Sequence, residues 1–294
     1  RSLCDWSSDV CSSDLRFAHM ASLLALLSAA LWGSSDFEGG RISKRFPAIS
    51  VLGATQLISL LFGAALVIIV GETQINWKIF LSGAAAGLCG YVGLICLYAG
   101  LSTGKMGVVS PISSLSTLIP MSIALVGGET LSTGRAIGCA LALLGAFLTS
   151  GPEFSQGFSL RPLALAFGAA LGFGTALSFM AIGAKEAPIL TMVCMRIATA
   201  FVTIAIAIRK KGFGGLGRPQ LPSLIFVGIA DFAANATLGL AVHIGPVAIS
   251  MVLGALYPAF TVMLAALFLH ERLHKFQYFG ALSAIAGVAL ISAF

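Results

Sequence analysis

The stretch at residues 189–208, ILTMVCMRIATAFVTIAIAI, decides the class of this protein. A helix needs about 20 apolar residues to cross the hydrocarbon core of a bilayer, and this stretch supplies them with Arg196 as its one charged side chain. The whole chain is 58% hydrophobic and 10% charged. Because a soluble domain is usually about 25% charged, this composition excludes a soluble enzyme and a disordered chain, and it indicates a helical membrane protein.

Apolar runs of similar length recur along the chain, and short polar loops separate them. They predict ten transmembrane helices and no soluble domain. The predicted spans are 20–39, 48–70, 79–101, 106–127, 134–150, 162–183, 189–208, 222–243, 246–269 and 275–293. The formal net charge of +6 then marks loops and orientation, and we expect no nucleic-acid partner.

The first fifteen residues, RSLCDWSSDVCSSDL, differ from everything after them. They are polar, and they lack the basic and apolar regions of a signal peptide. We interpret residues 1–15 as a non-native leader translated from a sequencing adapter, with a disordered tail as the alternative. The other cysteines lie singly in apolar runs, so we expect no disulfide framework, no metal site and no cofactor. These cysteines are Cys89, Cys96, Cys139 and Cys194.

The rest of the chain reads as two five-span repeats, residues 16–151 and 152–294. A shift of 142 residues places Glu129, Leu131, Gly138 and Gly145 on Glu271, Leu273, Gly280 and Gly287. Because five is an odd number, two similar halves must cross the membrane in opposite directions. The loop cations agree, since their bias switches sides between the halves. The predicted fold is an all-α integral membrane protein with ten transmembrane helices in two inverted-topology five-helix repeats.

Two motifs resemble a known family. Residues 31–37, LWGSSDF, resemble the W-G-S-x-x-F signature that opens EamA-type transporters of the drug/metabolite transporter superfamily. The G-E-x-L turn of that family is present at Gly128-Glu129, and at His270-Glu271 with His in place of Gly. Tyr257-Pro258 precedes Glu271 by thirteen residues, where the family commonly has a proline. The resemblance covers residues 20–294 and implies a five-plus-five inverted fold that transports small metabolites without covalent chemistry.

Ionisable side chains inside a bilayer cost roughly 2.5–3.5 kcal/mol, so they are rare and face the protein interior. Asp231 lies midway along the eighth predicted span, and Asn235 follows one turn later on the same face. Two interpretations are open: Asp231 binds a proton or the substrate, or it makes a structural contact between helices. Arg196 is its counter-ion, a ligand for an anionic substrate group, or a side chain that snorkels to the interface.

Four further residues are candidates for a substrate path. Asp36, near the end of the first span, shares a helix face with Trp32, so the two form a gate or vestibule, or else a wetted helix end with an interfacial anchor. Ser114 and Tyr257 belong to hydroxyl stripes in the fourth and ninth spans, which line a path or hydrogen-bond neighbouring helices. Pro258 is expected to kink the ninth span.

Residues 270–274, HERLH, match H-E-x-x-H, the helix signature of zinc peptidases. The match defines a runner-up function, a membrane-embedded zinc metalloprotease with His270 and His274 as ligands and Glu271 as base. Because repetition of Glu129 already explains Glu271, we interpret the two histidines as a coincidence and expect no enzymatic activity.

We therefore predict a secondary transporter that moves a small organic metabolite, such as an amino acid or a drug-like compound, by alternating access. Export and a bacterial inner-membrane location are the expectations that the resemblance favours. The expected partners are the small-molecule substrate, the lipid bilayer and protons as coupling ion, in a monomer or homodimer. A facilitative channel is a further alternative.

Overall fold

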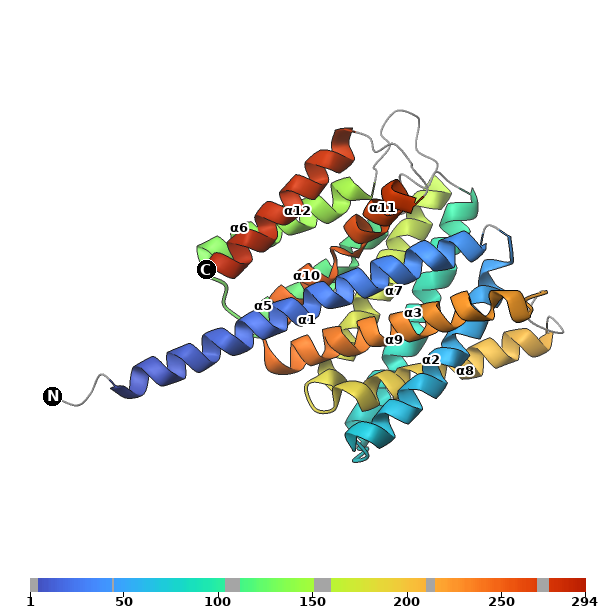
Figure 1. The fold of residues 1–294 in the computed structure, drawn as a ribbon, viewed down its shortest axis with the longest axis horizontal. Helices are drawn as coiled ribbons and strands as arrows, with labels where there is room; N and C mark the ends of the chain where they lie inside the picture. The colour runs from blue at the N-terminus through green and yellow to red at the C-terminus, as the bar shows by residue number, and fades with distance from the viewer. Residues whose placement is uncertain (1–4, 44, 104–111, 151–159, 210–214, 269–274) are drawn as a thin grey trace.

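The computed structural model describes residues 5–43, 45–103, 112–150, 160–209, 215–268 and 275–294, and every regular element in them is a helix (Figure 1). The first half contains α1 (Asp5–Ser43), α2 (Ala48–Val70), α3 (Trp77–Thr103), the 3₁₀ helix η1 (Leu115–Thr117), α5 (Leu118–Val126) and α6 (Thr133–Thr149). The second half contains α7 (Leu160–Ala184), α8 (Pro188–Arg209), the 3₁₀ helix η2 (Arg218–Gln220), α9 (Leu221–Ile244), α10 (Val247–Gly254), α11 (Tyr257–Phe268) and α12 (Lys275–Ala293).

The helices have the lengths and composition that a membrane requires. Within the described residues, eight are long and apolar enough to cross a bilayer, and two shorter apolar helices, Ile112–Val126 and Thr133–Thr149, lie in the fourth and fifth predicted spans. Their bounds follow the ten predicted spans closely; α8, for example, adds one residue at each end of 189–208. The prediction of an all-α membrane protein with ten spans is confirmed.

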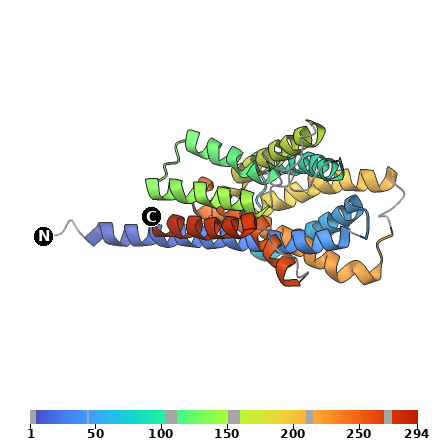
Figure 2. The same ribbon diagram turned by 90° about the horizontal axis from the view of Figure 1, so that it is seen from above.

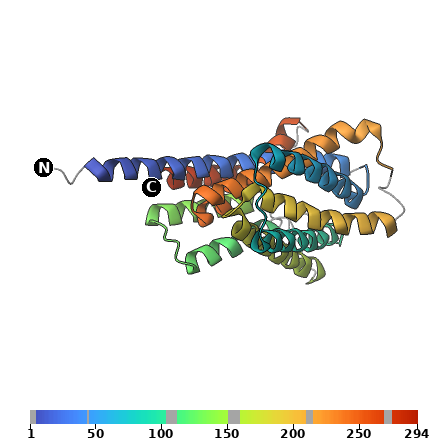
Figure 3. The same ribbon diagram turned by 90° about the horizontal axis from the view of Figure 1, so that it is seen from below.

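The first helix is longer than its predicted span. Its N-terminal part projects past the other helices (Figures 1 and 3). The part that is apolar enough to cross a membrane begins at His19. The interpretation of residues 1–15 as a non-native leader stays a prediction.

Equivalent helices of the two halves run antiparallel. In the pair α6–α12, which lies side by side in Figures 1 and 2, a Cβ atom added to Gly138 would lie 2.9 Å from the Gly287 carbonyl, and one added to Gly280 would lie 2.6 Å from the Thr149 amide. Residue numbers therefore rise along one helix as they fall along the other. The glycines that repeat in the sequence are the residues that let these backbones approach, as small residues do between membrane helices. The two repeats are thus inverted.

Two further helix pairs, α1–α9 and α3–α7, place the first span of one half against the third span of the other. In the α1–α9 pair, Ser35 Oγ donates to the Val227 carbonyl at 3.3 Å. In the α3–α7 pair, a Cβ atom on Gly172 would lie 2.7 Å from the Gly93 Cα. The pairs are equivalent under exchange of the halves, and together with α8 and α10–α11 they surround the centre of the bundle.

The ninth span is broken, as its proline predicted. α10 ends at Gly254, and α11 begins at Tyr257, next to Pro258. Proline has no N–H to donate to the carbonyl four residues earlier, and its ring clashes with that carbonyl, so the helix cannot continue unchanged. The Ala255 and Leu256 amides instead bond to the Met251 and Leu253 carbonyls. The break turns the Tyr257 side chain to the centre of the bundle.

Candidate functional site: a central cavity between the two halves

A cavity of about 210 Å³ lies where α1, α3, α7, α8, α9 and the break between α10 and α11 meet. Its polar lining consists mainly of Trp32, Asp36, Gln56, Arg196, Asp231, Asn235 and Tyr257. The volume is below the usual range of about 300–1,000 Å³ for drug-sized ligands, which fits a small metabolite. A concave site with a few converging polar groups inside apolar helices is where a ligand would bind.

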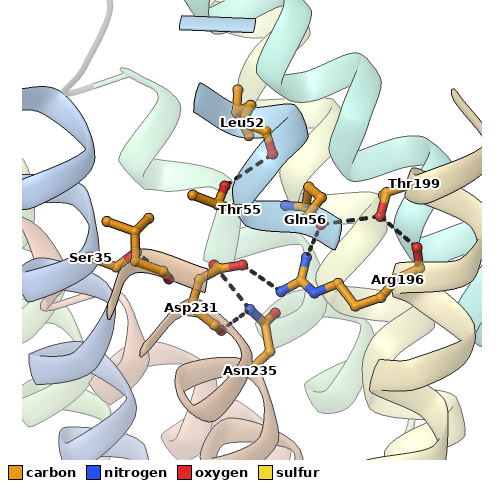
Figure 4. Close-up of polar contacts among 9 residues, drawn as sticks. Ser35, Leu52, Thr55, Gln56, Arg196, Thr199, Asp231 and Asn235 are labelled. Carbon is orange, nitrogen blue, oxygen red and sulfur yellow. Dashed lines mark hydrogen bonds and ion pairs between the residues drawn. The ribbon is translucent and has the colours of Figure 1, made fainter. Parts of the chain in front are cut away.

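Arg196 is the centre of a polar network in this cavity (Figure 4). Its side chain is 3% exposed, and its Nη2 donates to Asp231 Oδ2 at 2.6 Å. Its Nη1 donates to Gln56 Oε1 at 2.8 Å, and the Thr199 hydroxyl donates to the same oxygen at 3.1 Å. A buried guanidinium is tolerated only with such partners, because an unpaired charge away from water is costly. The ion pair therefore joins α8 to α9, and Gln56 joins α8 to α2.

Asn235 completes the network from the same helix as Asp231. Its amide nitrogen donates to the Asp231 carbonyl at 2.7 Å and to Asp231 Oδ1 at 3.4 Å. One carboxylate oxygen of Asp231 is thus held by Arg196 and the other by Asn235. The Asp231 side chain keeps 25% of its surface exposed, so it is fixed in place but still faces the cavity.

Asp36 is the acidic side chain that this network leaves out. It is exposed to the cavity, and its carboxylate has no hydrogen-bond or ion-pair partner among the described residues. One turn earlier on α1, the Trp32 ring packs edge-on against Tyr257, with ring centroids 6.1 Å apart. Asp36 therefore presents a free carboxylate beside two aromatic rings.

The two halves contribute unequally to the cavity. Gly33 packs against Tyr257 and Phe260, and in the other half Gly174 packs in the same way against Ser116 and Ile119. The residue numbers of each equivalent pair therefore differ by 141. Gly87 packs on Met195 as Gly228 packs on Thr55, which gives 141 for the third spans and 140 for the second spans. The 142-residue shift read from the sequence holds for α6 and α12. It is one too large for α1, α3, α7, α9 and the ninth span, and two too large for α2 and α8.

This shift pairs a polar residue with an apolar or smaller one at each position of the cavity. The pairs are Trp32 with Phe173, Asp36 with Leu177, Asp231 with Gly90, Asn235 with Leu94, and Tyr257 with Ser116, and all ten residues line the cavity. We call the first member of each pair, with Arg196 and Gln56, the polar wall, and the second members the apolar wall. Apart from Arg196 and Gln56, the polar wall comes from α1, α9 and the break in the ninth span, and the apolar wall comes from α3, α7 and η1.

Six of the seven site residues predicted from the sequence line the cavity: Trp32, Asp36, Arg196, Asp231, Asn235 and Tyr257. The seventh, Ser114, is buried just before η1 and does not line the cavity. Ser116 and Thr117, which follow it in the same span, line the cavity instead. A helical stripe gives the spacing of hydroxyls but not the rotation of the helix, which explains the difference.

Sequence reasoning missed Gln56 and Thr199. Gln56 is an amide in an otherwise apolar span with a few hydroxyls, and this isolation was a usable signal. Thr199 lies three residues after Arg196, one turn along the same helix. Threonines are common in membrane helices, however, so nothing in the sequence marked Thr199 as a site residue.

At one end of the bundle, acidic side chains from the loops join the two halves. The Glu72 carboxylate accepts the amides of Ile189 and Leu190, both at 3.0 Å, at the N-terminus of α8. Glu129 of the G-E-x-L turn accepts those of Val247 and Ala248, at 2.9 and 3.0 Å, at the start of α10. The first amides of a helix lack internal partners and attract anions, so both glutamates bind the first half to the second.

A third contact at this end is an ion pair between α3 and the α7–α8 loop. Lys78 Nζ lies 2.5 Å from Glu186 Oε1, and the Asn76 amide donates to Oε2 at 2.8 Å. The hydrogen bond from Lys78, and then that from Asn76, lower the pKa of Glu186 from its ordinary value of 4.5. The pair is exposed, so water and salt weaken it.

The H-E-x-x-H residues His270, Glu271 and His274 lie outside the described part of the chain. Inside that part, no group of three or more His, Cys, Asp or Glu side chains is placed to hold a metal ion.

Comparisons with known proteins agree with this architecture. The family model of the EamA-like transporter family matches residues 19–151 and again residues 160–293. A solved structure titled "Crystal structure of protein" superposes with a TM-score of 0.76 at 17% identity, over 92% of this chain and 95% of that chain. No curated protein matches. At this identity the solved structure supports the fold alone, whereas the double family match covers most of the chain.

Proposed function

Because this chain belongs to the EamA-like transporter family, and is thus a membrane transporter of the drug/metabolite transporter superfamily, we propose that it exports a small organic metabolite by alternating access. The proposed substrate is an amino acid or a drug-like compound at the small end of that class, because the cavity of about 210 Å³ is smaller than the usual site for a drug-sized ligand. The energy comes from an ion gradient or from the gradient of the substrate itself. The membrane is the inner membrane of a bacterium.

The central cavity is the observation that carries this proposal. It lies on the axis between two inverted halves, where transporters built from inverted repeats bind their substrates. Its charged residues come from three helices, α1, α8 and α9, so the site is complete only when these helices are correctly placed. A relative movement of the halves therefore changes both the geometry of the site and the side to which it opens.

The contacts between the halves at this end favour a carrier over an open channel. The carboxylates of Glu72 and Glu129 bind helix N-termini of the other half through charge-assisted hydrogen bonds. Each such contact is modest in net free energy because water replaces it on opening. We propose that these contacts break when the transporter opens to this side, on the microsecond to millisecond scale of such motions.

The two cavity carboxylates have different proposed roles. Asp231 is fixed between Arg196 and Asn235, so it orients the polar wall, and it is also a candidate for proton coupling. Asp36 is unpaired and faces the cavity, so it contacts the substrate directly. Protons are the proposed coupling ion.

The test is counterflow in vesicles that contain the purified protein, with a panel of radiolabelled amino acids, amines and organic acids. We expect counterflow of at least one compound without ATP, and a loss of about tenfold or more in Arg196→Ala and Asp231→Asn, since each removes a charged partner from the site. Glu38→Gln is the matched control, because Glu38 pairs with Arg41 at 2.7 Å outside the cavity. Absence of flux for the whole panel, or flux unaffected by the cavity variants, would refute the proposal.

A pH gradient across the vesicle membrane tests whether protons are the coupling ion. If protons drive transport, collapsing the gradient with a protonophore abolishes accumulation but leaves counterflow. Accumulation that persists without any gradient would exclude protons as the coupling ion, and a pH dependence unchanged in Asp231→Asn would exclude Asp231 from that role.

A further inference from the structure

The charges around the central cavity do not cancel. In the described part of the chain, three charged side chains line it: Asp36, Asp231 and Arg196. The Asp231 and Arg196 charges neutralise each other at 2.6 Å, and Gln56 occupies the other terminal nitrogen of the guanidinium. One negative charge, that of Asp36, is left without a partner. A bound substrate that supplies one positive charge would neutralise the site.

The surroundings of Asp36 fit an ammonium group. Trp32 lies one turn earlier on the same face of α1. Tyr257, at the break in the ninth span, packs against the Trp32 ring, with an angle of 72° between the two ring planes. Aromatic faces attract cations, most strongly away from bulk water. A carboxylate next to two aromatic rings thus offers both an ion pair and cation–π contacts to one small cation.

The opposite wall of the cavity fits an apolar group. Leu177 stands in the position equivalent to Asp36, Phe173 in that of Trp32, and Leu94 in that of Asn235. These side chains have no polar atom to offer a second charged group. A molecule that spans the cavity therefore meets a carboxylate at one side and, at the other, mainly apolar side chains with the uncharged hydroxyl of Ser116.

An anionic or zwitterionic substrate fits these walls poorly. Its carboxylate would need Arg196, whose two terminal nitrogens already donate to Gln56 and Asp231. The remaining nitrogen, Nε, is buried and has no partner among the described residues, so a ligand in the cavity cannot reach it without a rearrangement. Binding a carboxylate would thus require the ion pair to break.

We infer that the substrate is an amphipathic organic monocation, an amine whose ammonium group binds Asp36 between Trp32 and Tyr257 while its apolar body lies against Phe173 and Leu177. The inference rests on the proposed transport function and narrows its substrate class. It selects amines over amino acids and organic acids, all of which the size of the cavity admits.

The test is calorimetric binding at neutral pH of three compounds with the same phenylethyl body: 2-phenylethylamine, phenylalanine and 3-phenylpropionate. We expect the amine to bind more tightly than the zwitterion by about tenfold, and the acid more weakly still, because only the amine pairs with Asp36 without adding a carboxylate. Tighter binding of phenylalanine or 3-phenylpropionate would overturn the inference.

Variants of the cavity residues test which side chains cause the preference for the amine. Asp36→Asn should weaken binding of 2-phenylethylamine by about tenfold to a hundredfold, and Asp36→Glu should keep the preference for the amine. Glu38→Gln, two residues along the same helix, is the control and should bind as the wild type does. Phe173→Ala should weaken all three compounds alike and keep their order. An Asp36→Asn variant that elutes and melts normally yet binds the amine as tightly as the wild type would overturn the assignment.

Failure of the inference is distinguishable from failure of the transport function. Counterflow of an amino acid or organic acid that depends on Arg196, with no binding of the amine, would refute the cation and support transport. Absence of both binding and counterflow for every compound would count against both.

Discussion

The α1–α9 and α3–α7 pairs are the same structural unit used twice, and they differ in what their side chains do. In the α3–α7 pair, glycines bring the backbones together, since a Cβ on Gly172 would lie 2.7 Å from the Gly93 Cα. The equivalent positions in the α1–α9 pair are Leu31 and Ala234. The α1–α9 pair instead carries Asp36 and Asp231, where the α3–α7 pair has Leu177 and Gly90.

This asymmetry shows where function is located in an inverted repeat. Duplication supplies two copies of one backbone arrangement, so the fold alone does not distinguish the two pairs. The charged residues of the cavity are confined to one copy and its neighbour α8, and the other copy provides dry packing and an apolar surface. The asymmetry between equivalent residues therefore marks the binding site more sharply than the repeat itself.

The largest expected effect tests the charged side of this comparison. Arg196→Ala leaves Asp231 and Gln56 without their partner inside the bundle, and removing one member of a buried pair costs roughly 3–5 kcal/mol. We expect a loss in the free energy of unfolding of about 3 kcal/mol, at the lower end because Asp231 is 25% exposed. Denaturation of the purified protein in mixed micelles measures it.

The matched control is the double variant Arg196→Ala/Asp231→Ala, which removes the uncompensated charge. It should be more stable than the sum of the single variants predicts, because the two residues are coupled. Additive losses would show that the ion pair contributes nothing beyond its separate members. Arg209→Ala, at the exposed end of the same helix, should change stability by less than about 0.5 kcal/mol.

The second effect tests the close packing of the α3–α7 pair. Gly172→Ala places a methyl group against the backbone of Gly93, which cannot rotate away, so the helices must separate at a cost of about 1–3 kcal/mol. Gly90→Ala is the control on the facing helix, because its nearest contact would be the Ala176 Cβ at an ordinary 3.6 Å. Melting temperatures of both variants check this, and equal values would mean that the α3–α7 pair is not tightly packed.

How far the sequence leads can be judged from these residues. Span bounds, inversion and the break at Pro258 were predictable because they depend on local composition, on the parity of five and on the missing N–H of proline. The contact of Arg196 with Asp231 was one of the interpretations left open. Asp36 was a predicted candidate for the substrate path, with a wetted helix end as the alternative. Its lack of a partner, the displacement of Ser114 and the 141-residue equivalence were not predictable, since they depend on helix rotation and packing.

The third effect asks whether the binding site can be moved across the axis. Phe173 and Leu177 are spaced as Trp32 and Asp36 are, so Leu177→Asp recreates a carboxylate one turn after an aromatic ring. In the Asp36→Asn background, this change should restore most of the roughly tenfold loss in affinity for 2-phenylethylamine. Calorimetry checks it. A double variant as weak as Asp36→Asn alone would show that the surroundings of α1, and not the carboxylate alone, define the site.

The smallest effect concerns the ends of the two pairs. Lys78 and Glu186 close the α3–α7 pair with an ion pair, whereas the equivalent positions in the α1–α9 pair are Pro219 and Arg45, which cannot attract each other. Because the folded protein lowers the pKa of Glu186 below 4.5, the stabilisation is present above about pH 4.5 and is lost as the pH falls through the folded pKa. Exposure keeps its size small.

Melting temperatures of the wild type and Glu186→Gln against pH isolate this contribution. The wild type should be slightly more stable at neutral pH, and the difference should shrink as the pH falls through the lowered folded pKa of Glu186, because protonated Glu186 is as neutral as the glutamine. Arg45→Gln should show no such change over the same range, because arginine keeps its charge throughout. A Glu186→Gln difference that persisted in acid would mean that shape and hydrogen bonding, rather than charge, hold this end of the α3–α7 pair. The charge asymmetry between the two pairs would then be confined to the cavity.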